Sequence, residues 1–257
     1  MLEEHDPGEV RRVRLAAAGD LHCSQHRREQ VRASLAALDG RADLVLLAGD
    51  LTTHGEPGQA AVLAEACAGL EAPVVAVLGN HDWHAGRRDE VVAALEEGGI
   101  RVLDRAAAVL AVNGIDVGVV GVKGFVGGFS GSHLPDFGEP LLRSVYRETS
   151  LEVEALERGL RDVALCPARI VLMHYAPTEE TIVGEAPGIR AFLGSDRLAA
   201  PIAEHEPDLV LHGHAHGGTF QGAIGATPVY NVSVPVIGRD FWLFELDVSA
   251  PVRTPIR

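Results

Sequence analysis

Five short clusters of polar residues each follow directly after an apolar segment of the sequence. The clusters are Asp20-Leu21-His22, Gly49-Asp50, Gly79-Asn80-His81-Asp82, Met173-His174 and Gly213-His214-Ala215-His216. Asp and Asn offer oxygen ligands and His offers nitrogen, and none of the cysteines falls among them. This mixture of donors suits a hydrolytic pair of divalent metal ions better than a structural zinc site.

Each cluster alone is weak evidence, because Gly-Asp and Gly-Asn are ordinary turn dipeptides and a histidine after a strand is common. All five in order, each behind a β-like segment, are specific as a set. Ligands of open α/β sheets bind outside the carboxyl ends of the strands. Five such segments could therefore converge on one pocket.

The elements that would position these clusters are apolar β-like segments alternating with amphipathic helices, which is typical of a largely parallel sheet. We expect strands at residues 12–18, 44–48, 74–78, 170–173, 209–211, 229–232 and 241–248. We expect helices that begin after a capping Ser24, at Pro57, around residues 91–95, and at residues 150–165 and 196–204. The dipeptide Asn113-Gly114 predicts a type I′ hairpin, which would add antiparallel strands.

The ordered motifs DLH, GD, GNHD, H and GHAH resemble those of the calcineurin-like metallophosphoesterase superfamily. The resemblance spans Asp20 to His216, and the small cyclic-nucleotide phosphodiesterase-like branch is nearest in layout. It implies an α/β fold, a four-layer αββα sandwich of two mixed β-sheets flanked by helices. We therefore expect residues 1–257 to form a single metallophosphoesterase domain.

The resemblance also implies a role for each motif residue. One metal ion would be held by Asp20, His22 and His216, the other by Asn80, His174 and His214, with Asp50 bridging them. A pair of ions about 3.5 to 4 Å apart can acidify a shared water toward a pKa of about 7, and the hydroxide would attack phosphorus in line. His81 would protonate the leaving oxygen. Manganese is the first expectation, and Fe, Zn, Ni or Co would also fit these ligands.

Three functions are compatible with these motifs. We expect a phosphodiesterase for a cyclic nucleotide or another small diester. A phosphomonoesterase of small metabolites is the alternative, although the arginine that phosphoprotein phosphatases place just after the GD motif is missing from Leu51-Thr52-Thr53-His54. A non-catalytic scaffold on the same fold is disfavoured, because every expected ligand position is filled.

The composition of the chain limits the classes of partner that it could bind. Its 257 residues are 47 % hydrophobic, enough for one large core, and the formal net charge is −14. That charge argues against stable binding of nucleic acid or of an anionic membrane. Because no apolar stretch has the length of a signal peptide or a membrane span, we expect a cytoplasmic protein with a small-molecule phosphoester as its partner. The oligomeric state stays open.

A few residues near the motifs have two interpretations each. Asp82 could cap a helix or support a ligand, and His54 could touch substrate or lie in a loop. Lys123 could bind a phosphate or lie on the surface. The glycine-rich residues 123–149 are predicted to form a long loop that could line the pocket. Residues 178–188 could form an acidic rim that disfavours highly charged substrates.

Overall fold

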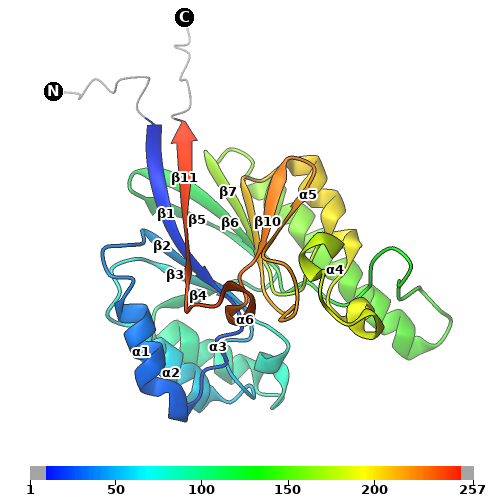
Figure 1. Cartoon of the computed structure of the whole chain (residues 1–257), viewed down its shortest axis with the longest axis horizontal. Helices are drawn as coiled ribbons and strands as arrows, with labels where there is room; N and C mark the ends of the chain where they lie inside the picture. The colour runs from blue at the N-terminus through cyan, green and yellow to red at the C-terminus, as the bar shows by residue number, and fades with distance from the viewer. Residues whose placement is uncertain (1–9, 250–257) are drawn as a thin grey trace, which may run out of the picture.

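The computed structural model describes residues 10–249, which form two β-sheets that pack face to face between helices (Figure 1). The strands of the first sheet are β1 (Val10–Ala18), β2 (Leu44–Ala48), β3 (Val74–Val77), β4 (Ile100–Val102) and β11 (Trp242–Ser249). The second sheet contains β5 (Ala106–Val112), β6 (Ile115–Gly121), β7 (Ala168–Leu172), β8 (Leu209–His212), β9 (Gln221–Ile224) and β10 (Thr227–Asn231). Their orders are β11-β1-β2-β3-β4 and β5-β6-β7-β8-β10-β9.

Helices cover the outer face of each sheet. The first sheet is covered by α1 (Arg28–Ala36), α2 (Pro57–Cys67) and α3 (Arg88–Glu97), and the second by α4 (Pro140–Asp162) and α5 (Ala199–His205). A short α6 (Val234–Ile237) connects β10 to β11. Both sheets are mixed, because β11, β5 and β9 each run antiparallel to a neighbour. The predicted four-layer sandwich is therefore confirmed.

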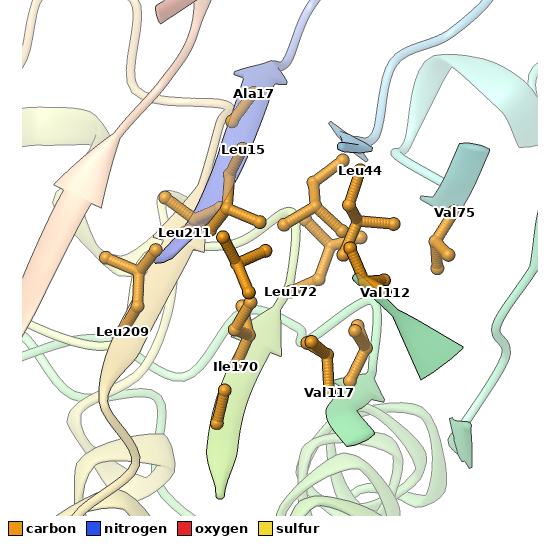
Figure 2. Packing of buried hydrophobic residues seen from close by; sticks show 14 of the residues in the cluster. Leu15, Ala17, Leu44, Val75, Val112, Val117, Ile170, Leu172, Leu209 and Leu211 are labelled. Carbon is orange, nitrogen blue, oxygen red and sulfur yellow. The ribbon is translucent and has the colours of Figure 1, made fainter. Parts of the chain in front are cut away.

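One large apolar core lies between the two sheets. Leu15 and Leu44 from the first sheet meet Ile170 and Leu211 from the second (Figure 2). The alternate residues of the same strands, such as Ala16, face α1, α2 and α3 instead. Strands that are buried on both faces need apolar residues at successive positions, which explains their nearly continuous hydrophobic sequences.

Parallel pairing brings the polar clusters to one edge of each sheet. The strands β1, β2 and β3 are parallel neighbours, as are β7 and β8, and all five carry a predicted cluster after their last residue. The predicted hairpin joins β5 to β6, and its two turn residues, Asn113 and Gly114, have φ values of 51° and 72°. Two successive positive φ values are the requirement of a type I′ turn.

Some predicted boundaries were wrong. Ser24 occupies the N-cap position of a 3₁₀ turn (Gln25–Arg27) that precedes α1, but its side chain makes no capping hydrogen bond. The helix predicted at residues 150–165 begins ten residues earlier, at Pro140, so the loop after Lys123 is shorter than expected. The first buried residue of α4 is Thr149, whereas Leu141 is 77 % exposed. The exposed first turns of α4 carry no core-facing pattern from which the helix could be recognised.

The short strand β9 was not predicted either, because it lies at a sheet edge with mostly exposed residues. The predicted single domain of residues 1–257 extends at both ends beyond the described residues. Within the described part of the chain, every helix is too short or too polar to cross a membrane.

Candidate metal centre

The turns after the strands hold four of the predicted ligands in an unusual backbone conformation. Among the described residues, seven that are not glycine have a positive φ, and four of these are Asp20 (59°), His22 (45°), Asp50 (48°) and His214 (68°). Side chains with a Cβ atom disfavour this region by about 1–2 kcal/mol. Backbone strain of this kind clusters at functional sites, where the surrounding structure maintains it.

Asp50 lies at the middle of the cluster and is almost completely buried. Its Oδ1 atom is 3.4 Å from Nε2 of His174, which comes from the other sheet. Its Oδ2 atom is 3.8 Å from Nε2 of His22 and 3.8 Å from Nε2 of His81. The two oxygens of one carboxylate thus face different imidazoles.

Asp20 anchors the loop that carries the last two predicted ligands. Its Oδ1 atom is 2.8 Å from Nε2 of His216, and its Oδ2 atom accepts a hydrogen bond from the backbone N–H of His214 at 2.9 Å. Burial alone would raise the pKa of Asp20, but the hydrogen bond with His216 and nearby imidazoles outweigh it and lower that pKa. The same hydrogen bond raises the pKa of His216.

His174 shows how the ring nitrogens are oriented. Its Nδ1 atom is 2.9 Å from the carbonyl oxygen of Ala48, which can only accept, so Nδ1 carries the proton. In the neutral ring the Nε2 atom then presents a lone pair, and it faces Oδ1 of Asn80 at 3.0 Å as well as Asp50. Acceptors that face one another at such distances are the donor set that a divalent cation satisfies.

Two further histidines have one ring nitrogen committed to a backbone carbonyl. His81 Nδ1 is 2.8 Å from the oxygen of Thr53, and His214 Nε2 is 3.1 Å from the oxygen of Phe192. In the neutral ring the other nitrogen of each keeps a lone pair, and in His81 this nitrogen, Nε2, is the one that could take up a second proton. Burial lowers the pKa of His214 to about 4, so its imidazole is neutral at neutral pH. Neutral imidazoles with a fixed tautomer are the form that binds metals.

Candidate ligand atoms gather in three overlapping groups at this site, and within each group they all lie within 4.8 Å of one another. The groups are Asp20 with His22 and His216, His22 with Asp50 and His81, and Asp50 with His174 and His214. With Asn80 beside His174, the structure brings all seven predicted ligands together. His81, which was predicted to lie near the metals without binding them, is also within reach of Asp50.

Asp82 ties together the loops that carry Asp50 and Asn80. Its fully buried carboxylate accepts hydrogen bonds from the backbone N–H groups of Leu51, Thr52 and Gly79 and from the hydroxyl of Thr52. Burial raises the pKa of Asp82. Of its two predicted roles, helix cap or support of a ligand, these contacts favour support.

The secondary candidates have different surroundings. His54 is exposed, as expected of a loop histidine. Lys123 is buried, its Nζ atom donates to the carbonyl oxygen of Gly124, and it lies 4.2 Å from the ring centre of Phe125. Tyr175, whose ring centre is 4.4 Å from that of His214, was not predicted from the sequence. Its position directly after the predicted ligand His174 is the sequence signal that could have identified it.

Comparison with known proteins gives one match by sequence family and several by structure. The model of the family described as calcineurin-like phosphoesterase matches residues 13–218. No curated protein matches the chain significantly by sequence.

Among solved structures, the phosphopantetheinyl hydrolase from Mycobacterium tuberculosis is 15 % identical with a TM-score of 0.62, and the match covers 94 % of this chain and 98 % of the other. A Staphylococcus aureus protein assigned as a 5′-nucleotidase is 13 % identical with a TM-score of 0.58, covering 96 % and 56 %. GAP50, described as the anchor in the inner membrane complex of Plasmodium, is 13 % identical with a TM-score of 0.55, covering 92 % and 81 %. At these identities the likeness supports a shared fold.

Proposed function

Because the chain belongs to the calcineurin-like phosphoesterase family, whose members hydrolyse phosphoesters with a centre of two divalent metal ions, we propose that it is a phosphodiesterase for small diesters. The observation that carries the proposal is the position of Asp50, whose two oxygens face His174 and His22. A carboxylate placed between two sets of nitrogen donors suits a bridge between two ions.

The remaining ligands divide between the two sides of Asp50. Asp20, His22 and His216 would hold one ion, and Asn80, His174 and His214 would hold the other. When bound, two divalent ions supply positive charge to the phosphoryl oxygens and an acidified water as nucleophile. Manganese is our first proposal for both, since mixed oxygen and nitrogen ligands accept it together with several other metals.

His81 would deliver a proton to the leaving oxygen. Its Nδ1 proton is held by the carbonyl of Thr53, so the ring is fixed with Nε2 directed into the site beside Asp50. Its side chain is 32 % exposed, which leaves room for a substrate to approach. An imidazole fixed in this way would act as a general acid for a poor leaving group when Nε2 carries a second proton.

A comparison of two chromogenic substrates tests the proposal. We expect the protein, purified and loaded with Mn²⁺, to hydrolyse bis(p-nitrophenyl) phosphate with a higher kcat/KM than p-nitrophenyl phosphate. A clear preference for the monoester would favour the alternative, a phosphomonoesterase of small metabolites. A panel of cyclic nucleotides, each assayed with Mn, Fe, Zn, Ni and Co, would then identify the substrate and the metal.

A scaffold without catalysis is the remaining alternative, and the fold itself is compatible with it, since GAP50 is described as an anchor. The complete set of ligands favours an enzyme. Elemental analysis of the purified protein separates the two functions. If the protein binds no divalent ion, and no added metal produces hydrolysis of any ester, the proposed phosphodiesterase is wrong.

A further inference from the structure

Large apolar side chains are exposed in two of the segments that carry candidate ligands. Trp83 belongs to the turn that begins at His81, and it is exposed. Val183, Ile189 and Phe192 are exposed as well, and all three come from the segment between β7 and β8. Single exposed apolar residues need no explanation, so only one that contacts the centre can point to a ligand.

Phe192 is the member of this group that the structure ties to the centre. Its carbonyl oxygen accepts the hydrogen bond from Nε2 of His214 at 3.1 Å. The Cβ atom of a residue lies about 3 Å from its own carbonyl oxygen, by standard covalent geometry. The Cβ atom of Phe192 therefore lies within about 6 Å of Nε2 of His214, and the residue is 56 % exposed.

The backbone around Phe192 is held firmly on both sides. The carbonyl of Ala191 accepts from the N–H of Gly127 at 3.2 Å, and the carbonyl of Leu193 accepts from the N–H of Ala176 at 3.0 Å. Leu193 is buried in a small apolar cluster that includes Ala215, the residue between His214 and His216. Leu193 thus anchors the backbone of the segment, and the neighbouring Phe192 is exposed to solvent.

The carboxylate next to His216 disfavours a second anionic group on that side of the rim, whereas Arg190 belongs to the same short helix as Phe192. Glu185 accepts a hydrogen bond from the N–H of Gly217 at 2.7 Å, which places a carboxylate next to His216. Lys123, the lysine of the predicted pocket loop, is buried and lies over the ring of Phe125. A flat uncharged group suits these surroundings better than a second phosphate.

We propose that Phe192 forms an aromatic subsite that selects phosphodiesters whose non-leaving ester group is a flat aromatic ring. The inference rests on the proposed phosphodiesterase function and adds the substrate class. The phenyl ring would stack on this group while the phosphate occupies the metal centre. Stacking of a flat group on one aromatic side chain favours its binding by on the order of tenfold.

Two diesters with the same leaving group test the inference. p-Nitrophenyl phenyl phosphate and p-nitrophenyl methyl phosphate release the same phenolate and differ in the group that would meet Phe192. We expect Phe192→Ala to lower the ratio of their kcat/KM values, phenyl over methyl, about tenfold relative to the original protein, mainly through KM. Phe192→Leu, which keeps apolar contact but lacks the flat ring, should fall in between. Phe137→Ala, at a comparably exposed phenylalanine outside this segment, should leave the ratio unchanged.

The possible outcomes separate the two proposals. An unchanged ratio in Phe192→Ala, or an equal change in Phe137→Ala, would overturn the subsite while diester hydrolysis itself continued. No hydrolysis of either diester would overturn the proposed function instead. Calorimetry would still decide the subsite in that case, because phenyl phosphate should bind the metal-loaded protein more tightly than methyl phosphate, and Phe192→Ala should remove the difference. Equal binding of both would reject the subsite.

Discussion

The imidazole of His174 packs so closely against Gly49 that a Cβ atom at position 49 would lie 2.5 Å from Nδ1 of His174. The two residues belong to different sheets, since Gly49 follows β2 and His174 follows β7. Gly49 also has a φ of +82°, a backbone conformation that residues other than glycine rarely adopt. The contact between the sheets at the candidate centre thus requires glycine at this position for two reasons.

We expect Gly49→Ala to lower the free energy of unfolding by about 2–4 kcal/mol, through backbone strain and displacement of the imidazole. The matched control is Gly40→Ala, because Gly40 has a φ of +65° but a Cβ atom added there would meet nothing within 4 Å. That variant should lose only about 1–2 kcal/mol. Urea unfolding of both variants measures the difference, and equal losses would show that the contact with His174 is not tight.

Asp50→Asn should impair the binding of both metal ions, because Asp50 faces donors on each side and the amide offers a single, uncharged oxygen. Substitution of a residue that only hydrogen-bonds to a metal ligand already weakens metal binding about 10–100-fold. We expect at least that loss when the proposed ligand itself is changed. Elemental analysis after dialysis against Mn²⁺ gives the metal content. Asp39→Asn, at an exposed aspartate, is the control and should keep the full content. Unchanged metal content in Asp50→Asn would exclude the bridging role.

His81→Ala should affect substrates according to their leaving group. A general acid contributes about 10²–10⁴-fold to the rate when the leaving oxygen needs a proton. We therefore expect a loss of that size for an alkyl leaving group and a much smaller loss for p-nitrophenolate, which leaves without protonation. His26→Ala changes a histidine outside the centre and should have no effect on either ester. Equal losses on both esters in His81→Ala would assign the residue a role other than proton delivery.

Asp43 gives a prediction for the dependence of stability on pH. Its carboxylate accepts hydrogen bonds from the guanidinium and the backbone N–H of Arg14, and the bond to the guanidinium is the main cause that lowers the pKa of Asp43. A carboxyl whose pKa is lowered by folding stabilises the fold above its unfolded pKa of about 3.9, and this contribution is lost as the pH falls through the folded value.

Asp43→Asn should therefore be less stable than the original protein at pH 7, and the difference should shrink as the pH is lowered from about 4 toward 2. Urea unfolding at several pH values measures it. A difference that is the same at pH 7 and at the acid end would mean that the ion pair with Arg14 does not contribute through its charge.

The sequence allowed the layers of the fold and the members of the candidate centre to be predicted, because both depend on local patterns. An apolar strand followed within three residues by Asp, Asn or His identifies a strand end, such as the one before Asp50, without knowledge of the rest of the fold. Parallel pairing then determines that such ends lie together. The metal-binding roles of these residues remain proposals.

Other features depend on contacts that leave no trace in residue types. The oxygens that orient His174, His81 and His214 belong to the backbone of Ala48, Thr53 and Phe192, and any residue provides a carbonyl. The first turns of α4 face solvent, so they carry no pattern that places their start at Pro140.

The positive φ values of Asp20, His22, Asp50 and His214 lower the stability of the fold at positions that the candidate metal centre needs. Glycine at any of these positions would relieve the backbone and remove a ligand in the same step. Stability alone would not favour glycine at every one of them, because Asp20 also accepts the hydrogen bond of the His214 N–H, but strain kept at working positions is expected of a fold selected for activity. Natural selection for activity, and not for stability, would then keep these strained residues in place.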